Sequence, residues 1–143
     1  MHNELADYIH FGWYVIPVHG VMVGRGGAMK CTCGNPACAS PGKHPTTREG
    51  LKNATVRKDW IDAWWKKWPF ANVGIVTGKQ SGLVVVDIDP RHGGDDSLDS
   101  LFVRHDRFPD TVEVMTGGGG RHFYFRHPGV EIRNSANKLG AGI

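Results

Sequence analysis

Apolar residues recur along the chain with two different spacings, and these predict both helices and strands. Spacings of three and four residues predict three helices, over residues 4–11, 56–68 and 96–108. Short continuous or alternating apolar runs predict five strands, over residues 13–18, 72–78, 82–89, 111–116 and 121–126. We expect an α+β fold with a mainly antiparallel sheet and flanking helices.

Turn-forming residues between neighbouring strands predict which strands pair. The segment GKQS separates residues 72–78 from residues 82–89, so these two strands are predicted to form a hairpin. Four consecutive glycines join residues 111–116 to residues 121–126 and predict a second antiparallel pair. The chain of 143 residues is long enough for one domain with its own core, so a single domain over residues 1–143 is expected.

The predicted helix over residues 56–68 is unusually rich in tryptophan. Thr55 is a suitable N-cap and Pro69 a suitable stop. Aromatic and aliphatic residues recur at helical intervals, at Trp60, Ile61, Trp64, Trp65 and Trp68. We interpret the tryptophans as anchors of this helix to the core, and stacking on nucleic-acid bases is the alternative.

Composition narrows the class of protein. The hydrophobic fraction of 40% and the charged fraction of 22% are typical of a folded globular protein and unlike a disordered tail. A net charge of +3 is compatible with nucleic-acid binding without indicating it. No apolar run approaches the roughly 20 residues of a membrane span, and the first ten residues lack the layout of a secretory signal. We therefore expect a cytoplasmic protein without a membrane partner.

Two carboxylates lie one residue apart in VVVDIDP, residues 84–90. Side chains alternate faces along a strand, so Asp87 and Asp89 are predicted to share a face. Like charges that converge are unfavourable unless a cation offsets them, and Mg²⁺ or Mn²⁺ prefers carboxylate oxygens. The alternative is that the strand simply ends here and Asp89 with Pro90 begins a solvated turn.

The segment GGGGRHFYF, residues 117–125, suggests a place for an anion. Glycines let backbone N–H groups approach a triphosphate closely, and the candidate donors here are Gly118, Gly119 and Gly120. His122 follows them at the start of a strand, where it could hydrogen-bond a phosphate. A flexible hairpin tip with an exposed histidine is the alternative.

The segment CTCGNPACASPGKH contains four candidate metal ligands, Cys31, Cys33, Cys38 and His44. Four such residues can close a tetrahedral Zn²⁺ site, which leaves no open position for catalysis. The loop around them, about residues 24–48, has almost no hydrophobic content, so a structural zinc ion is the simplest way to order it. Free thiols in a mobile loop are the alternative. Basic residues that flank the cluster are candidate contacts to template or primer, namely Arg25, Lys30, Lys43 and Arg48.

Five segments occur in a specific order and spacing: GWYVIPV (12–18), residues 42–55, W..WP.ANVGIVTG (65–78), SGLVVVDIDPRHGG (81–94) and MTGGGGRHFYFRHPG (115–129). In this order they resemble the N-terminal domain of bifunctional DNA primase/polymerases (prim-pol) of the archaeo-eukaryotic primase superfamily. That family is found largely in plasmids, phages and integrated elements. The resemblance extends from about Gly12 to the last residue.

The resemblance implies roles for several residues. Asp87 and Asp89 would be ligands of the catalytic Mg²⁺ or Mn²⁺ ions in two-metal nucleotidyl transfer, and His122 would contact the phosphates of the incoming nucleotide. Gly120 stands where the family often has a serine. Further candidate nucleotide-binding residues are Arg91, His92, Arg121 and Arg126.

The same resemblance implies a third metal-binding carboxylate after the glycine hairpin. Glu131 is the only acidic residue after Gly129, and it follows the hairpin too closely to match. The chain stops at Ile143, about where the third motif would begin, so we expect a C-terminally incomplete domain that is itself inactive.

The resemblance predicts a DNA primase/polymerase that acts in the replication of a mobile element, phage or plasmid. Its expected partners are a DNA template or primer and nucleoside triphosphates, and a helicase on the same or another chain is a further candidate. The alternative function is a zinc-stabilised nucleic-acid-binding module without catalysis. Another metal-dependent phosphotransferase or nuclease is a third, weaker option.

Overall fold

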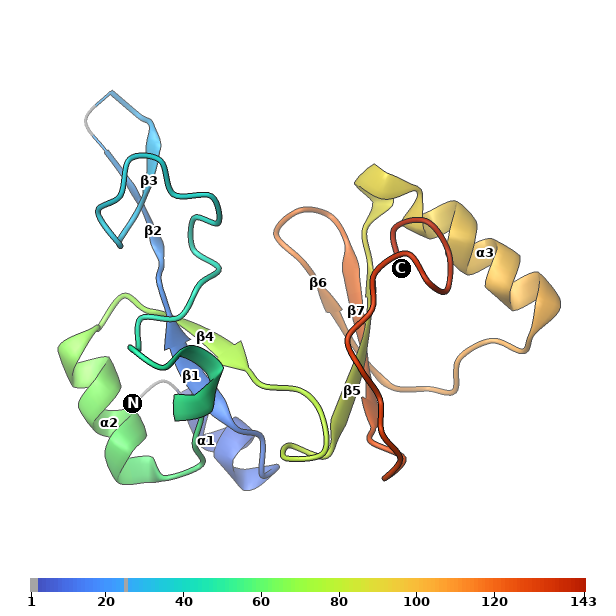
Figure 1. The fold of residues 1–143 in the computed structure, drawn as a ribbon, viewed down its shortest axis with the longest axis horizontal. Coiled ribbons are helices and arrows are strands. Elements are labelled where there is room, and N and C mark those ends of the chain that lie inside the picture. The colour runs from blue at the N-terminus through green and yellow to red at the C-terminus, as the bar shows by residue number, and fades with distance from the viewer. Residues whose placement is uncertain (1–2, 25) are drawn as a thin grey trace. The chain divides into compact units, whose positions relative to one another are not determined.

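The computed structural model describes residues 3–24 and 26–143 (Figure 1). The predicted contact of Arg25 with nucleic acid lies outside the described residues. The chain divides into two compact units, Met1–Ser81 and Gly82–Ile143, and each is described separately. The assignment of residues 1–143 to a single domain stays a prediction.

In the first unit the described residues form two α-helices, four strands and a 3₁₀ helix: α1 (Asn3–His10), β1 (Val15–Val18), β2 (Val21–Val23), β3 (Met29–Cys31), η1 (Gly50–Asn53), α2 (Lys58–Lys67) and β4 (Asn72–Ile75). Strands β1 and β4 pair antiparallel, with Val15 opposite Ile75. The core of this unit consists of side chains that are at most 8% exposed, from Leu5, Val15, Ile61 and Trp65. Both helices therefore bury their apolar faces beside β1.

Helix α2 begins later than predicted. The proposed N-cap Thr55 is wrong, because the helix starts at Lys58 and Arg57 is the N-cap residue. The backbone of Thr55 exchanges hydrogen bonds of 3.1 and 3.0 Å with Val15, which hold Thr55 extended beside β1. Its hydroxyl instead accepts a hydrogen bond from the Arg57 N–H at 3.1 Å. Because of this pairing, the helix begins at Lys58, two residues after its predicted start at residue 56.

The tryptophans of α2 have two different environments. Trp65 is 8% exposed and belongs to the core, as predicted. Trp60 is 46% exposed, so the prediction that it anchors the helix is wrong. Trp60 precedes the buried Ile61 by one residue, which is about 100° around the helix, so its side chain points away from the buried face.

The region predicted to be a long loop contains a short hairpin. Strands β2 and β3 pair antiparallel, with Val21 opposite Cys31. All three side chains of β2 are exposed, so no alternation of apolar and polar residues marks it in the sequence. The chain then returns to β1 through a bridge between Val18 and Pro45.

The second unit is a three-stranded antiparallel sheet with one helix. Its elements are β5 (Leu83–Ile88), η2 (Pro90–His92), α3 (Gly94–Arg104), β6 (Val112–Met115) and β7 (Arg121–Arg126), and the strand order is β5-β7-β6. Leu98 of α3 packs with Ile88 and Phe123 to form the core on one sheet face. The predicted pair of strands around the four glycines is confirmed.

The predicted hairpin between residues 72–78 and 82–89 is wrong. β4 pairs with β1, and β5 pairs with β7. Beyond β4 the Val76 N–H still donates to the Tyr14 carbonyl at 2.9 Å, so the chain continues along β1 instead of turning back. Each of the two strands pairs with a strand that is distant in the sequence. The turn-forming segment GKQS reports only on its immediate neighbours and could not indicate these partners.

The α+β class with antiparallel strands is confirmed, with the strands distributed over three small sheets. Helix α3 ends at Arg104, four residues before its predicted end. Among the described helices none is long and apolar enough to cross a bilayer.

Candidate catalytic site and metal centre

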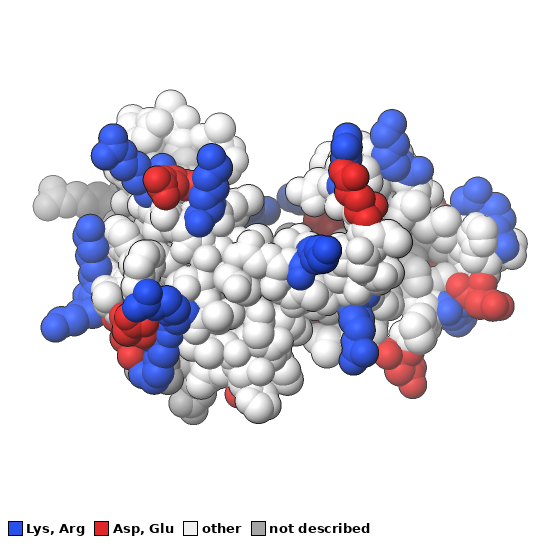
Figure 2. Space-filling model, turned by 60° about the horizontal axis from the view of Figure 1, so that its bottom comes forward, with Lys and Arg blue, Asp and Glu red and all other residues white. Residues whose placement is uncertain are grey.

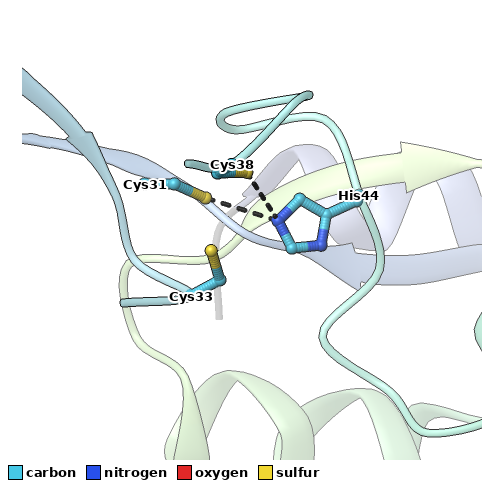
Figure 3. Close-up of side chains that lie close together, drawn as sticks. All are labelled: Cys31, Cys33, Cys38 and His44. Atoms are coloured by element: carbon cyan, nitrogen blue, oxygen red, sulfur yellow. Dashed lines mark hydrogen bonds between the residues drawn. The ribbon is translucent and has the colours of Figure 1, made fainter. Parts of the chain in front are cut away.

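The four candidate zinc ligands of the first unit converge on one point (Figure 3). The sulfur atoms of Cys31 and Cys38 each lie 3.4 Å from Nε2 of His44. All four ligand atoms, including that of Cys33, lie within 4.8 Å of one another. Zinc–sulfur bonds of about 2.3 Å in a tetrahedron require sulfur atoms about 3.8 Å apart, so the cluster is consistent with a structural zinc ion.

The thiols of this cluster differ in acidity. Burial alone would raise the pKa of Cys31, but hydrogen bonds from Cys33, Gly42 and His44 outweigh it and lower this pKa to about 6. Burial and the neighbouring Cys33 and Cys31 raise the pKa of Cys38. One thiolate is therefore ready to bind a cation at neutral pH, whereas Cys38 must lose a proton first.

A histidine that the cysteine spacing does not reveal supports the cluster. The ring of His19 lies 4.5 Å from that of His44, centroid to centroid. Nδ1 of the His19 ring is 2.9 Å from the hydroxyl of Thr32, and the backbone N–H of His19 donates to the backbone carbonyl of His44 at 2.8 Å. Burial and the neighbouring His44 lower the pKa of His19, which favours its neutral form. His19 and Thr32 thus hold His44 in place, and no ligand-spacing motif includes them.

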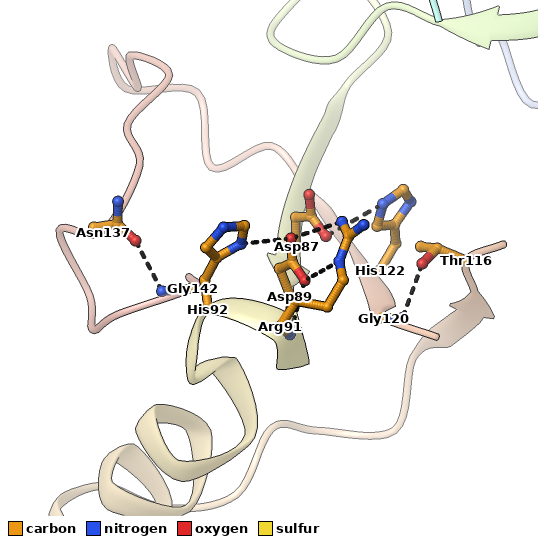
Figure 4. A network of polar contacts seen from close by, with 9 residues as sticks. All are labelled: Asp87, Asp89, Arg91, His92, Thr116, Gly120, His122, Asn137 and Gly142. Carbon is orange, nitrogen blue, oxygen red and sulfur yellow. Dashed lines mark hydrogen bonds and ion pairs between the residues drawn. The ribbon is translucent and has the colours of Figure 1, made fainter. Parts of the chain in front are cut away.

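In the second unit, Asp87 and His122 are directly opposite each other on β5 and β7 (Figure 4). Oδ1 of Asp87 lies 3.4 Å from Nε2 of His122. The Asp87 side chain is 68% exposed, on the sheet face opposite the core formed by Ile88. The structure therefore brings a solvent-accessible carboxylate and an imidazole together at the end of β5.

Asp89 lies just beyond β5, and both its carboxylate oxygens are engaged. Oδ1 accepts from Nε and from the backbone N–H of Arg91, both at 3.0 Å. Oδ2 lies 2.9 Å from Nη2 of Arg91 and 2.9 Å from Nδ1 of His92. The hydrogen bonds from Arg91, then those from His92, hold the pKa of Asp89 well below its usual range, and Asp89 in turn raises the pKa of Arg91.

The backbone of Asp89 is held by the last residues of the chain. The Asp89 N–H donates to the carbonyl of Gly142 at 2.8 Å, and the Gly142 N–H donates to Oδ1 of Asn137 at 2.8 Å. A Cβ atom at Gly142 would lie 2.6 Å from the Asp89 carbonyl oxygen, and one at Gly94 would lie 2.7 Å from the same oxygen. Sequence reasoning missed this contact, although the glycines of KLGAGI are a signal of close backbone approach.

Thr116 closes the glycine loop, which consists of residues 117–120. The sequence pattern did not predict this role of Thr116. The Thr116 N–H donates to Gly120 O at 2.8 Å, and its hydroxyl accepts from the Gly120 N–H at 2.9 Å. The Gly119 N–H donates to Thr116 O at 3.0 Å. Within the described part of the chain the N–H groups of Gly117 and Gly118 make no hydrogen bond. These two donors, and not those of Gly119 and Gly120, are open to an anion.

Arg91 links the glycine loop to Asp89. A Cβ atom at Gly118 would lie 3.6 Å from the guanidinium carbon of Arg91. The same guanidinium is paired with Asp89, and its side chain is 64% exposed. One cation therefore lies between a carboxylate and two open N–H groups, where a phosphate oxygen could replace the carboxylate.

A family model describes the chain over nearly its whole length. The model of the N-terminal domain of bifunctional DNA primase/polymerases, Prim-Pol, matches residues 5–143. The chain belongs to this family. Membership implies primase/polymerase activity, that of a nucleotidyltransferase with DNA and nucleotide substrates. Comparison with curated proteins and with solved structures gives no match.

The Prim-Pol resemblance suggested a serine in place of Gly120, and the structure shows why this chain has glycine. A Cβ atom at Gly120 would lie 2.4 Å from the carbonyl oxygen of Ile88 and 3.1 Å from the Thr116 hydroxyl. The β5 and β7 backbones approach each other here too closely for any side chain. In this Prim-Pol chain the hydroxyl beside the loop comes from Thr116 instead.

Two predicted nucleotide-binding arginines of this Prim-Pol chain are not brought to Asp87. Arg121 is opposite Ile88 on the core side of the sheet, where it pairs with Asp95 at 2.8 Å and Glu113 at 3.7 Å. Arg126 shares the face of Asp87 but is opposite Leu83, four residues and about 13 Å along the strand.

Glu131, the one acidic residue after Gly129, is not brought to the Prim-Pol site in this structure. Its carboxylate pairs with Nε of Arg133 at 2.7 Å, and both side chains are exposed. The residues that the structure does gather are Asp87, Asp89, Arg91, His92 and His122, with the glycine loop beside them (Figure 4).

Proposed function

We propose that the chain is the catalytic domain of a DNA primase/polymerase that carries out metal-dependent, template-directed nucleotidyl transfer in the replication of a mobile element, phage or plasmid. One observation carries this proposal. Asp87 and Asp89 at the end of β5 lie beside His122, Arg91 and two open N–H groups of the glycine loop. Nucleotidyl transfer needs two sets of groups: carboxylates that bind the cations, and hydrogen-bond donors that bind the phosphate oxygens.

The donor set of β5 fits Mg²⁺ or Mn²⁺. Asp87 and Asp89 both offer carboxylate oxygens, which these cations prefer. Asp87 is exposed and ready to bind, whereas Asp89 would exchange its contacts with Arg91 and His92 for a cation. When bound, the cations would activate the primer 3′-hydroxyl and neutralise charge on the triphosphate.

Arg91 and the glycine loop would hold the triphosphate. Released from Asp89, the guanidinium of Arg91 can make two hydrogen bonds to phosphate oxygens, next to the N–H groups of Gly117 and Gly118. His122 would donate a further hydrogen bond from the neighbouring strand. The 3′-oxygen forms its bond to the α-phosphorus, pyrophosphate leaves with the electrons of the broken bond, and the hydroxyl proton passes to solvent.

The zinc cluster would have a structural role in this function. Four protein ligands complete a tetrahedral site and leave no position for substrate. The ion would order a hairpin whose side chains, apart from Cys31, are exposed and contribute no core. Lys30, Lys43 and Arg48 flank the cluster and are candidate contacts to template or primer phosphates.

A primer-extension assay tests the catalytic assignment. The protein that the complete gene encodes is purified and given a labelled primer on a template, nucleoside triphosphates, and Mg²⁺ or Mn²⁺. Asp87→Asn and Asp89→Asn should each lower the incorporation rate about 100-fold or more, because the cations supply several kcal/mol of transition-state stabilisation. The matched control is Asp99→Asn on the exposed side of α3, which should retain the wild-type rate. Full activity in both β5 variants contradicts the assignment.

One observation favours a second candidate, a zinc-stabilised nucleic-acid-binding module without catalysis. Arg91 and His92 already occupy both oxygens of Asp89, an arrangement that suits a site without cations. This candidate predicts no nucleotide incorporation by the protein that the complete gene encodes. It also predicts that Cys31→Ser abolishes DNA binding, whereas Asp87→Asn leaves it intact.

A further inference from the structure

The unit Met1–Ser81 contains a groove that the catalytic assignment does not use. It has a volume of about 340 Å³ and lies between α2 and the segment that follows the zinc cluster. Three indoles, from Trp60, Trp64 and Trp68, and two cations, from Arg48 and Lys67, line it. The described residues that line the groove include no carboxylate. The groove is therefore both aromatic and basic.

Trp60 and Trp64 lie on one line along α2, because they are spaced four residues apart, and Trp68 is the C-cap residue directly after the helix. The rings of Trp60 and Trp64 meet edge to face, with centroids 6.2 Å apart. Trp60 is 46% exposed and Trp68 is partly exposed, in contrast to the buried Trp65 on the core side of the same helix. Large indole surfaces therefore remain accessible to a planar ligand.

The cations of the groove are distributed on both of its sides. Nζ of Lys67 lies 4.6 Å from the centre of the Trp68 ring. Arg48 lines the opposite wall and forms no ion pair with any of the described residues. A third cation, Arg57, lies 5.2 Å from the Trp60 ring, but its charge is compensated by Asp59 at 2.7 Å. Arg48 and Lys67 are the cations available to an anionic ligand.

The wall opposite α2 is held in place by hydrogen bonds. The N–H and hydroxyl of Thr46 both donate to the carbonyl of Pro17, at 3.0 and 3.1 Å. The Thr47 hydroxyl donates to the Gly50 carbonyl at 3.2 Å. This wall begins two residues after the zinc ligand His44. The groove is therefore formed before a ligand arrives, which reduces the entropy lost on binding.

We propose that this groove binds single-stranded nucleic acid, with bases stacked on Trp60 and Trp68 and phosphates paired with Arg48 and Lys67. Alternating bases and phosphates match a line of indoles flanked by cations, and a site without carboxylates attracts the phosphates. A duplex keeps its base faces inside its own stack and cannot offer them to indoles.

Charge alone does not locate this site. Figure 2 shows Lys and Arg side chains in separate groups, several of them next to Asp or Glu. The combination of accessible indoles and uncompensated cations distinguishes the groove. The proposal goes beyond the catalytic assignment, because the groove belongs to the unit that lacks Asp87 and Asp89 and its binding needs no chemistry.

The first test measures binding of oligo(dT), about 20 nucleotides long, to the protein without nucleotides or catalytic cations. Stacking should quench tryptophan fluorescence, and labelled oligo(dT) should gain anisotropy. Trp60→Ala should weaken binding about five-fold or more, because base–aromatic stacking contributes this much per base. The matched control is Phe70→Ala, since Phe70 is 81% exposed and does not line the groove. Thermal melting verifies that both variants fold.

The second test uses two neighbouring lysines of α2 and holds even where a tryptophan variant fails to fold. Lys67 lines the groove, whereas Lys66 lies with Leu5 and Pro69 on another side of the helix. Lys67→Ala should reduce the slope of log affinity against log salt concentration by about 0.7, the value for one lost phosphate contact on a single strand. Lys66→Ala should leave the slope unchanged.

Four results overturn the proposal. These are no binding of oligo(dT) by the wild-type protein, wild-type binding by Trp60→Ala, equal losses in Lys66→Ala and Lys67→Ala, and equal competition by duplex of the same length. Asp87→Asn should bind oligo(dT) like the wild type. A loss of incorporation in that variant with binding retained separates the groove from the catalytic site, so failure of one proposal is distinguishable from failure of the other.

Discussion

Arg91 and Asp89 form a two-point ion pair directly after β5, with Nε–Oδ1 and Nη2–Oδ2 distances of 3.0 and 2.9 Å. The pair places a guanidinium where a divalent cation would bind the carboxylate, and it places the same guanidinium beside Gly118. Cation binding at Asp89 and phosphate binding at Arg91 would therefore be coupled. A cation on Asp89 would free Arg91 to bind phosphate, and a phosphate on Arg91 would free Asp89 to bind a cation.

Removing Arg91 should raise the pKa of Asp89. The hydrogen bonds from Arg91 are the largest cause of its low value, so in Arg91→Ala the carboxyl should titrate closer to its ordinary pKa of 3.8. A carboxylate whose pKa is lower in the folded chain stabilises the fold above its unfolded pKa and loses this effect as pH falls through the folded pKa. The loss should therefore begin at higher pH in Arg91→Ala. NMR titration of the Asp89 carboxyl carbon, without divalent cations, measures this shift.

Arg121→Ala is the control for that titration. Arg121 lies on the other face of the sheet and pairs with Asp95 and Glu113. Its removal should leave the titration of Asp89 unchanged. If both arginine variants move the Asp89 signal equally, the ion pair with Arg91 does not set the pKa.

A side chain at Gly120 should destabilise the fold. In Gly120→Ala the new Cβ would lie 2.4 Å from the carbonyl oxygen of Ile88, which is backbone and can move only with β5. We expect a loss of about 1–3 kcal/mol in the free energy of unfolding, as for other overpacked sites. Gly117→Ala is the matched control, because nothing lies within 4 Å of its Cβ position. Denaturant unfolding of the two variants measures the difference, and equal stability would show that the β5–β7 contact is looser than described.

Loss of the histidine ligand should release zinc. His44→Ala removes the imidazole that lies 3.4 Å from two sulfur atoms, and zinc affinity should fall at least about ten-fold. Amide hydrogen exchange should rise in β2 and β3, because that hairpin has almost no core of its own. His105→Ala, at the C-terminal end of α3, should retain full zinc content. Equal zinc content in both variants would contradict the ligand assignment.

Zinc affinity should increase with pH. The pKa of Cys31 is lowered to about 6, so this thiol is already ionised at neutral pH. The pKa of Cys38 is raised, so zinc must displace its proton, which makes affinity rise about ten-fold per pH unit for each proton released. Competition with a chelator from about pH 7 to about pH 9 measures the slope. Cys38→Ser should reduce the slope by about one proton, and a flat profile in the wild type would rule out a protonated Cys38.

Local spacing in the sequence determined several parts of this protein. The α+β class and the strands around the four glycines follow from the spacing of apolar residues and from turn residues. The cysteine spacing likewise indicated a Cys₃His cluster, because ligands close in sequence need little tertiary structure to meet. These features depend on neighbours along the chain, which a sequence displays directly.

Only the tertiary structure decided the contacts between distant segments. β4 pairs with β1 instead of β5, because its partner is set by hydrogen bonds across about 60 residues of chain. Contacts between distant segments likewise place Gly142 in hydrogen-bond contact with Asp89 and His19 beside His44, and they leave Trp60 outside the core. A sequence pattern shows which side chains share a face of one element. It does not show what the fold brings against that face, and in this protein that decides how both candidate sites are built.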